Sequence, residues 1–117
     1  HQSAGVDDGQ NKRVRWFRAP HGQFTQTMAE QLRTLRMTNV MCDTYASCPI
    51  VQDGIFIAEH LTKTCQDGSV ILIHMPEKPF RHWCWDGLVE LLKGLQDRNL
   101  KAVTVSELVQ LAGWSPP

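Results

Sequence analysis

The stretch Gly68-Ser69-Val70-Ile71-Leu72-Ile73-His74 contains one of the two longest uninterrupted apolar runs of the chain. It follows an Asp67-Gly68 turn signal, and the run from Val70 to Ile73 predicts a strand over residues 69–74. Because no polar residue interrupts the run, we expect both faces of this strand to be buried, as in a parallel sheet. His74 then lies at the carboxyl end of a buried strand.

Predicted strands and helices alternate on both sides of this strand. The expected strands cover residues 13–17, 39–42, 69–74 and 102–105. One helix is expected to begin near Thr27, and three more are expected over residues 54–64, 85–98 and 106–112. Thr27-Met28-Ala29-Glu30 has the pattern of a capping box. This order predicts an α/β fold of four βα units with parallel strands, which is half of an eight-stranded barrel. A small doubly wound domain has the same order, but no G-x-G-x-x-G or phosphate-binding loop follows a strand, so nucleotide binding has no support.

Length, charge and hydropathy exclude several classes of function. The 117 residues fit one domain, which we expect over residues 13–112, with a flexible N-terminal segment (1–12) and a C-terminal tail (113–117). Twelve basic and twelve acidic side chains cancel, so no net field favours a nucleic-acid partner. No apolar stretch approaches the roughly 20 residues of a membrane span, and no signal peptide is visible, which leaves the compartment unknown.

The four cysteines are Cys42, Cys48, Cys65 and Cys84, and none of them forms a C-x-x-C pair. A zinc ribbon or a thioredoxin-like motif is therefore disfavoured. The even number permits two disulfides, but we favour reduced and mostly buried thiols, because Cys42 ends an apolar strand. A secreted origin would reverse this preference.

Polar side chains follow three of the predicted strands. Arg18 and His21 follow the first, Asp43 and Tyr45 follow the second, and His74 follows the third. In a parallel βα layer the carboxyl ends of the strands meet on one face, which is where α/β enzymes hold their active sites. We therefore expect these residues to converge on one site.

Three segments resemble the polysaccharide deacetylases, the chitin-deacetylase-like carbohydrate esterases built on the NodB homology domain (carbohydrate esterase family 4). Arg18-Ala19-Pro20-His21-Gly22 resembles the R-x-P-x-G motif of that family. Gly68-Ser69-Val70-Ile71-Leu72-Ile73-His74 is similar to its G-S-I-I-L-x-H strand. Lys101-Ala102-Val103-Thr104-Val105-Ser106-Glu107-Leu108 resembles the stretch that ends the domain. The resemblance runs from about Val14 to Val109 and covers the C-terminal part of the family's domain only.

The resemblance implies a deformed (β/α) barrel that hydrolyses N-acetyl groups of amino-sugar polymers with the help of a divalent metal, zinc or cobalt. It matches His74 to the general acid, Arg18 to the arginine that orients the catalytic aspartate, and Asp43 to the start of the family's fourth motif. It implies substrate contacts at five positions: Pro20, His21, Tyr45, Leu72 and Trp83. It also suggests an extracytoplasmic location.

The metal-binding motifs of the family are absent from this sequence. The T-F-D-D-G motif, which supplies the base and one metal ligand, and the H-x-x-x-H motif belong far upstream of R-x-P-x-G. Val6-Asp7-Asp8-Gly9 imitates the first motif, but no predicted strand precedes it, and no histidine pair has the H-x-x-x-H spacing. In addition, Cys48-Pro49 stands where an Asp-Trp pair is usual, and Met75 stands where an aspartate often follows the acid histidine. We expect no metal ligand in this chain, and a bound metal only if the missing upstream half is present.

Simpler structural roles also fit the same residues. Arg18 could pair with a carboxylate, His74 could be a hydrogen-bonded histidine at a strand end, and Trp83 could anchor its helix to the core rather than stack on a sugar. We therefore expect a polysaccharide deacetylase-like domain that is incomplete and inactive alone, with the N-terminal half of the barrel or another subunit as its partner and an amino-sugar polymer as its substrate. The alternative is a non-catalytic structural or carbohydrate-binding subunit of a larger assembly.

Overall fold

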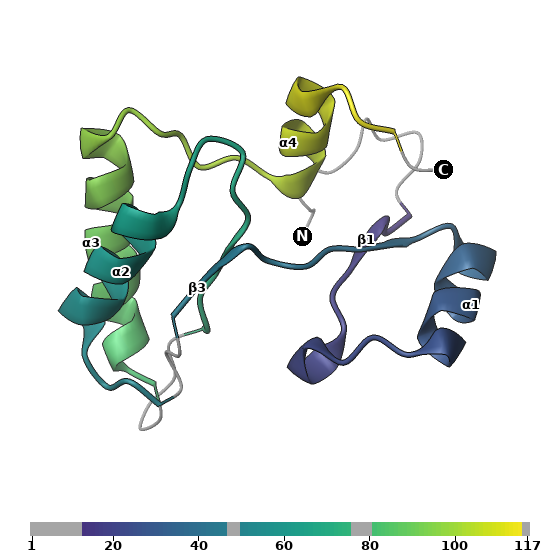
Figure 1. The fold of residues 1–117 in the computed structure, drawn as a ribbon, viewed down its shortest axis with the longest axis horizontal. Helices are drawn as coiled ribbons and strands as arrows, with labels where there is room; N and C mark the ends of the chain where they lie inside the picture. Colours follow the sequence, from purple (N-terminus) through teal and green to yellow (C-terminus); the bar gives the residue numbers. More distant parts are fainter. Residues whose placement is uncertain (1–12, 47–49, 76–80, 116–117) are drawn as a thin grey trace. The chain divides into compact units, whose positions relative to one another are not determined.

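The computed structural model describes residues 13–46, 50–75 and 81–115, and the chain divides into two compact units. Unit 1 runs from the N-terminus to Met41 and resumes at Val103, and unit 2 runs from Cys42 to Ala102. Unit 1 contains β1 (Trp16–Phe17), the 3-10 turn η1 (Pro20–Gly22), α1 (Gln26–Leu35), β2 (Thr38–Asn39) and α4 (Val105–Ala112). Unit 2 contains β3 (Thr44–Tyr45), α2 (Gly54–Thr64), β4 (Ile71–Leu72) and α3 (Trp83–Asp97). Figure 1 shows these elements along the chain.

In unit 2, the helices α2 and α3 pack closely against each other (Figure 1). Small residues permit this approach, because a Cβ atom on Gly54 would lie 2.6 Å from the Trp83 carbonyl oxygen and 2.8 Å from the Gly87 nitrogen. Toward the other end of the helices, a Cβ atom on Gly94 would lie 2.5 Å from the Thr62 hydroxyl oxygen. The two helices therefore run side by side in the same direction, as expected for consecutive βα units of a parallel layer.

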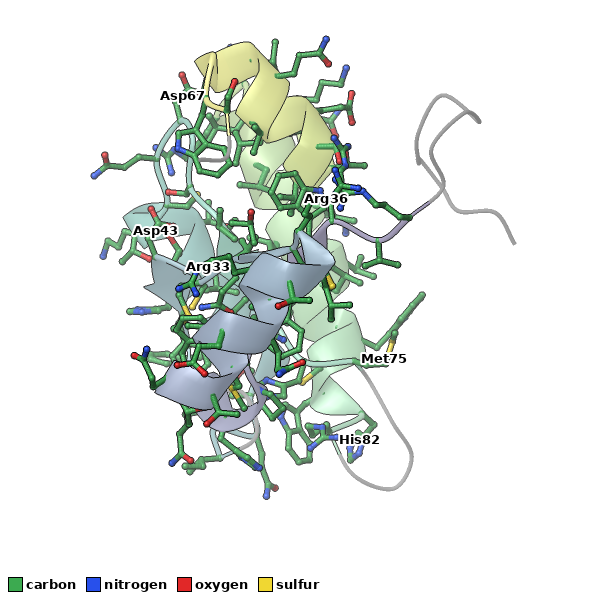
Figure 2. All side chains as sticks on the ribbon, turned by 90° about the vertical axis from the view of Figure 1, so that its right-hand side faces the viewer. Arg33, Arg36, Asp43, Asp67, Met75 and His82 are labelled. Carbon is green, nitrogen blue, oxygen red and sulfur yellow. The ribbon has the colours of Figure 1, made fainter. Side chains whose placement is uncertain are left out.

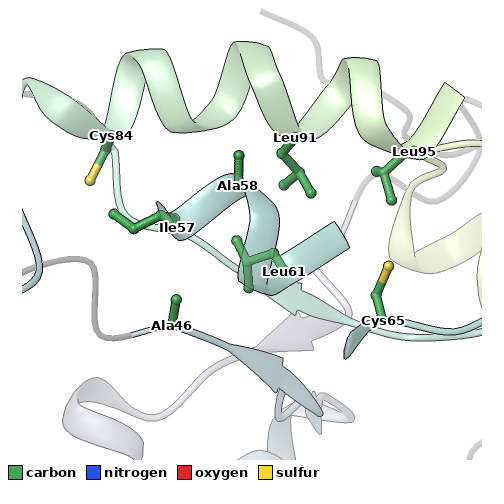
Figure 3. Close-up of a cluster of buried hydrophobic side chains, with 8 residues drawn as sticks. All are labelled: Ala46, Ile57, Ala58, Leu61, Cys65, Cys84, Leu91 and Leu95. Carbon is green, nitrogen blue, oxygen red and sulfur yellow. The ribbon is translucent and has the colours of Figure 1, made fainter. Parts of the chain in front are cut away.

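The hydrophobic core of unit 2 lies between these helices and β3. Figure 3 shows its buried cluster, which consists of Ala46, Ile57, Ala58, Leu61, Cys65, Cys84, Leu91 and Leu95. Ile57 and Leu61 have 0% exposure and lie one helical turn apart on α2. Arg98 closes the C-terminal end of α2, where its guanidinium donates to the carbonyl oxygens of Thr62 and Cys65. The side chain of Arg98 thus satisfies carbonyl groups that a helix end leaves without partners.

Side-chain hydrogen bonds join distant segments of unit 1. The Trp16 indole nitrogen and the Arg15 guanidinium donate to the Ser106 hydroxyl oxygen at 2.8 and 2.9 Å. Arg13 donates to the carbonyl oxygen of Arg36 at 2.6 Å. Among the described residues of this unit, the buried hydrophobic side chains are those of Ala19 and Leu32. Apolar burial therefore contributes less here than in unit 2.

The predicted fold is confirmed in outline and corrected in detail. Both strand pairs are parallel, with Trp16 opposite Thr38 in one pair and Thr44 opposite Ile71 in the other. The predicted helix over residues 54–64 is confirmed, and the two later helices begin one or two residues earlier than expected. The single strand expected over residues 39–42 is wrong, because β2 and β3 are two short strands that pair with different partners.

The arrangement of four βα units is not confirmed. Within the ranges that the structure describes, residues 102–105 form no strand, and Thr104 instead caps α4. A strand needs a neighbouring strand to form its ladder. The capping box also lies elsewhere than expected: Thr25 is the N-cap of α1, whereas Thr104 and Glu107 form a complete box at α4. Residues 1–12 and 116–117, which belong to the expected N-terminal segment and tail, lie outside the described residues.

The cysteines agree with the expected reduced state where they are described. Cys42 and Cys65 are free thiols, and Cys65 and Cys84 are buried in the core. Cys48 lies outside the described residues. Across the described ranges, no helix has the length and hydropathy needed to cross a bilayer.

Candidate functional site

The segment Arg18-Ala19-Pro20-His21-Gly22 leaves the end of β1 as a tight turn. Pro20 begins η1, and the Gly22 amide donates to the Ala19 carbonyl oxygen at 3.0 Å. His21 and Gly22 both have positive φ, 58° and 69°. Glycine adopts this left-handed conformation freely, but a histidine does so only at a cost, which surrounding structure must offset. The turn is therefore well defined, while the side chains of Arg18, Pro20 and His21 are exposed.

Two hydrogen bonds, one to Asn39 of β2 and one from the next residue, Val40, fix the start of this turn. The Val40 amide donates to the Phe17 carbonyl oxygen at 2.7 Å, in the parallel ladder. Beyond the ladder, the Ala19 amide donates to the side-chain oxygen Oδ1 of Asn39 at 3.2 Å. Sequence reasoning missed Asn39, because it carried no local signal beyond being the first residue of a predicted strand. Its role follows only from the pairing of β1 with β2.

In unit 2, the carboxyl end of the strand pair brings together three of the expected site residues. Tyr45 and Leu72 are direct neighbours across β3 and β4, and His74 lies two residues beyond Leu72. Tyr45 is 43% exposed, whereas Leu72 and His74 are half-buried. The carboxyl end of the strand pair is therefore followed or lined by a phenol, an aliphatic side chain and an imidazole.

Asp43 lies at the amino end of the same strand pair. We expected it to follow a strand, but β3 begins at the next residue. Its amide donates to the Val70 carbonyl oxygen at 3.0 Å, and its carboxylate oxygen Oδ1 accepts from the Val70 amide at 2.8 Å. Val70 directly precedes β4, whereas His74 lies two residues beyond its end. Asp43 therefore joins the two strands at their amino ends, whereas His74 follows the carboxyl end of β4.

Trp83 begins α3 and lies partly in the core. It is half-buried and packs against the buried cluster of unit 2, and its ring meets His82 edge-on at a centroid distance of 5.2 Å. Figure 2 shows His82 and Met75 on the same side of the molecule, with Asp43 on another side. The contacts of Trp83 fit the role of a helix anchor, and part of its surface is left accessible.

The expected site residues are divided between the two units. Arg18, Pro20 and His21 belong to unit 1, and Asp43, Tyr45, Leu72, His74 and Trp83 belong to unit 2. Among the described residues, no three His, Cys, Asp or Glu side chains come together as ligands of a metal ion. The described side chains thus do not fit the divalent metal that the resemblance implies.

The comparisons with known proteins support the fold. No family model matches the chain, and no curated protein matches it. Among solved structures, the chain is similar to a mutant of the peptidoglycan deacetylase PdaC from Bacillus subtilis, with a TM-score of 0.70 and 24% sequence identity. The fold of this chain is deacetylase-like. The match covers 84% of this chain but only 45% of the deacetylase, so the chain spans less than half of the structure that it resembles.

Proposed function

We propose that this chain is the C-terminal part of a polysaccharide deacetylase-like domain, which hydrolyses N-acetyl groups of amino-sugar polymers such as chitin. The observation that carries the proposal is the structural similarity to a peptidoglycan deacetylase over 84% of the chain. The three sequence motifs, which occur in the expected order, support it independently. The substrate is proposed by class, as a polymer of N-acetylated amino sugars.

The reaction divides into steps that need different groups. Water adds to the acetyl carbonyl carbon, the C–N bond then breaks, and the products are acetate and a free amine. The leaving nitrogen must receive a proton, and we assign this step to His74 as general acid. A divalent metal, when bound by the upstream half, supplies the polarisation that activates the attacking water.

The remaining residues bind and orient. Arg18 is exposed on a fixed turn, and we assign it to orient the carboxylate that acts as base in the upstream half. The proposed sugar contacts are Pro20 and His21 on the same turn, together with Tyr45 and Leu72 at the carboxyl end of the strand pair. Trp83 is proposed as a further sugar contact through its accessible part. Asp43 remains a proposed site residue whose structural and catalytic roles have to be separated by experiment.

The proposed partner is the upstream half of the barrel, which carries T-F-D-D-G and H-x-x-x-H. Large apolar side chains are exposed on unit 1: Val14, Phe24, Leu35, Met41, Leu111 and Trp114. Several exposed apolar side chains on one small unit favour a protein partner over bare solvent. We place the assembled domain in an extracytoplasmic compartment, where its polymeric substrate would be accessible.

The proposal is tested by measuring acetate release from chitin oligomers after the chain is joined to an upstream half that bears both metal motifs. We expect release, and we expect His74→Ala to lower its rate by on the order of 10² to 10⁴, the usual contribution of a general acid. His60→Ala is the matched control, because His60 lies on α2 and stacks on Phe56. Equal losses of the rate of acetate release in the two variants would contradict the role of His74 as general acid. Polymer binding without any acetate release would favour a non-catalytic carbohydrate-binding subunit.

A further inference from the structure

The Ala19 amide is a buried donor that the sheet itself does not satisfy. Ala19 is only 3% exposed, and it lies two residues beyond Phe17, where β1 ends. A buried backbone N–H requires a hydrogen-bond partner. The partner is the side-chain oxygen of Asn39, at 3.2 Å, rather than a backbone carbonyl. A side chain of β2 thus continues the contact between the two strands after the ladder has ended.

We propose that Asn39 is a positioning residue, which acts on the reaction through Arg18. This inference rests on the proposed function, because it concerns the arginine assigned to orient the catalytic base. No motif of the sequence includes Asn39 in the site. Its effect follows from the two peptide groups that flank Arg18.

Hydrogen bonds hold both peptide groups that flank Arg18. The peptide group before Arg18 contains the Phe17 carbonyl, which accepts from the Val40 amide at 2.7 Å. The peptide group after Arg18 contains the Ala19 amide, which donates to Asn39. The orientations of these two planes determine φ and ψ of Arg18 and hence the direction of its Cα–Cβ bond. Asn39 at the end of β2 and the next residue, Val40, therefore set the direction in which the exposed Arg18 side chain leaves the backbone.

An acceptor of this length is needed at position 39. Phe17 and Asn39 are paired in the parallel register, so the Asn39 side chain reaches one step beyond the last ladder bond. Leucine has nearly the same shape but no acceptor, so it would leave the Ala19 amide without this partner. Aspartate keeps an acceptor oxygen at the same place. The pair of substitutions thus separates the hydrogen bond from the volume of the side chain.

The first test measures amide hydrogen exchange of Ala19 by NMR in the 117-residue chain. We expect Asn39→Leu to accelerate exchange at Ala19 at least tenfold and Asn39→Asp to leave it within about twofold, in line with loss or retention of one buried bond. Thr38→Val is the matched control on the same strand, because Thr38 contributes its backbone to the ladder at Arg15. Unchanged exchange at Ala19 in a folded Asn39→Leu variant would overturn the anchoring.

The second test is a double-mutant cycle on acetate release by the assembled domain. We expect Asn39→Leu to lower kcat by on the order of tenfold to a hundredfold with little change in KM, because a misplaced positioning group can cost about 10² in rate. We expect Asn39→Asp to restore most of the rate. In an Arg18→Ala background, Asn39→Leu should cause no further loss, because its effect passes through Arg18.

The outcomes of the cycle distinguish positioning from general stability. The same fold-loss with and without Arg18 would show a merely structural role and overturn the proposal, as would full activity of Asn39→Leu. If the assembled domain with all residues unchanged released no acetate, the proposed function and the catalytic part of this inference would both fail. The exchange rate of Ala19 would still report separately whether Asn39 anchors the turn.

Discussion

The two units differ in what holds them together. Unit 2 has a buried cluster built on Ile57 and Leu61 of α2, and two helices that touch through glycine. Unit 1 fully buries only Ala19 and Leu32 among its described hydrophobic side chains. Side-chain hydrogen bonds, such as those from Trp16 and Arg15 to Ser106, also join its segments. A hydrogen bond contributes only about 0.5–1.5 kcal/mol net, whereas a fully buried Leu or Ile side chain contributes about 1.5–3 kcal/mol.

This difference bears on the candidate site. Unit 1 contains the turn with Arg18 and His21, and unit 2 contains His74, which follows the carboxyl end of β4. His74, the proposed general acid, therefore lies on a scaffold with a buried core of eight residues, whereas Arg18 lies on one that fully buries only Ala19 and Leu32 among its described hydrophobic side chains. We infer that the upstream half of the barrel matters most for unit 1, whose described part buries fewer hydrophobic side chains than that of unit 2.

The largest expected effect is loss of the core of unit 2. Leu61→Ala should lower the free energy of unfolding by about 2–5 kcal/mol, because the side chain has 0% exposure and its removal leaves a cavity. Leu35→Ala on α1 is the matched control, since Leu35 is 57% exposed, and it should cost less than about 1 kcal/mol. Urea unfolding followed by circular dichroism measures both. Equal losses of unfolding free energy in the two variants would contradict the burial of Leu61 in the core of unit 2.

Overpacking the contact between α2 and α3 should have the next largest effect. Gly54→Ala should lower the free energy of unfolding by about 1–3 kcal/mol, because the added methyl group would meet backbone atoms that cannot move aside easily. Gly87→Ala is the graded control, since its nearest backbone contact would be 3.3 Å rather than 2.6 Å. Thermal unfolding of the two variants should rank Gly54→Ala as the less stable. The reverse order would show that the helices approach each other elsewhere.

In unit 1 we expect a smaller effect from removing a polar contact. Ser106→Ala deletes the acceptor of the Trp16 indole and the Arg15 guanidinium, and should cost about 0.5–1.5 kcal/mol. Ser106→Thr keeps the hydroxyl and should retain most of the stability. The indole N–H resonance of Trp16 in NMR spectra should shift in the alanine variant and much less in the threonine variant. An unshifted resonance in Ser106→Ala would indicate that this contact is not formed.

The smallest effect on stability is expected at Asp43. Asp43→Asn retains an oxygen that can accept from the Val70 amide, so the free energy of unfolding should change by less than about 1 kcal/mol. Urea unfolding checks this, with Asp43→Leu as the variant that removes the acceptor. If Asp43 acts only on the strand register, Asp43→Asn should also leave acetate release by the assembled domain within a few-fold. A loss of 10² or more with unchanged stability would instead assign Asp43 to the chemistry.

The sequence predicted the elements whose signals are local. The spacing of Ile55, Ala58 and Leu61 predicted α2 over residues 54–64, although Ile55 is 51% exposed and Ile57 is buried in its place. The run before His74 predicted a parallel strand, of which β4 is the paired part, but residues 69–74 are half-buried rather than buried on both faces. The sequence did not predict where strands divide or which carbonyl a side chain meets. The split between β2 and β3 and the contact of Asn39 with Ala19 depend on pairing between segments that lie 20 or more residues apart. Such contacts leave no periodic trace in the chain.

The most direct test of the account is metal-dependent acetate release from chitin oligomers, measured for the 117-residue chain alone and for the chain joined to an upstream half with both metal motifs. A general acid alone cannot replace the several kcal/mol that a polarising metal supplies to the transition state. We therefore predict no release above background from the chain alone, and release by the assembled domain that a chelator abolishes. Chelator-sensitive release by the chain alone, or none from a folded assembly, would contradict the account.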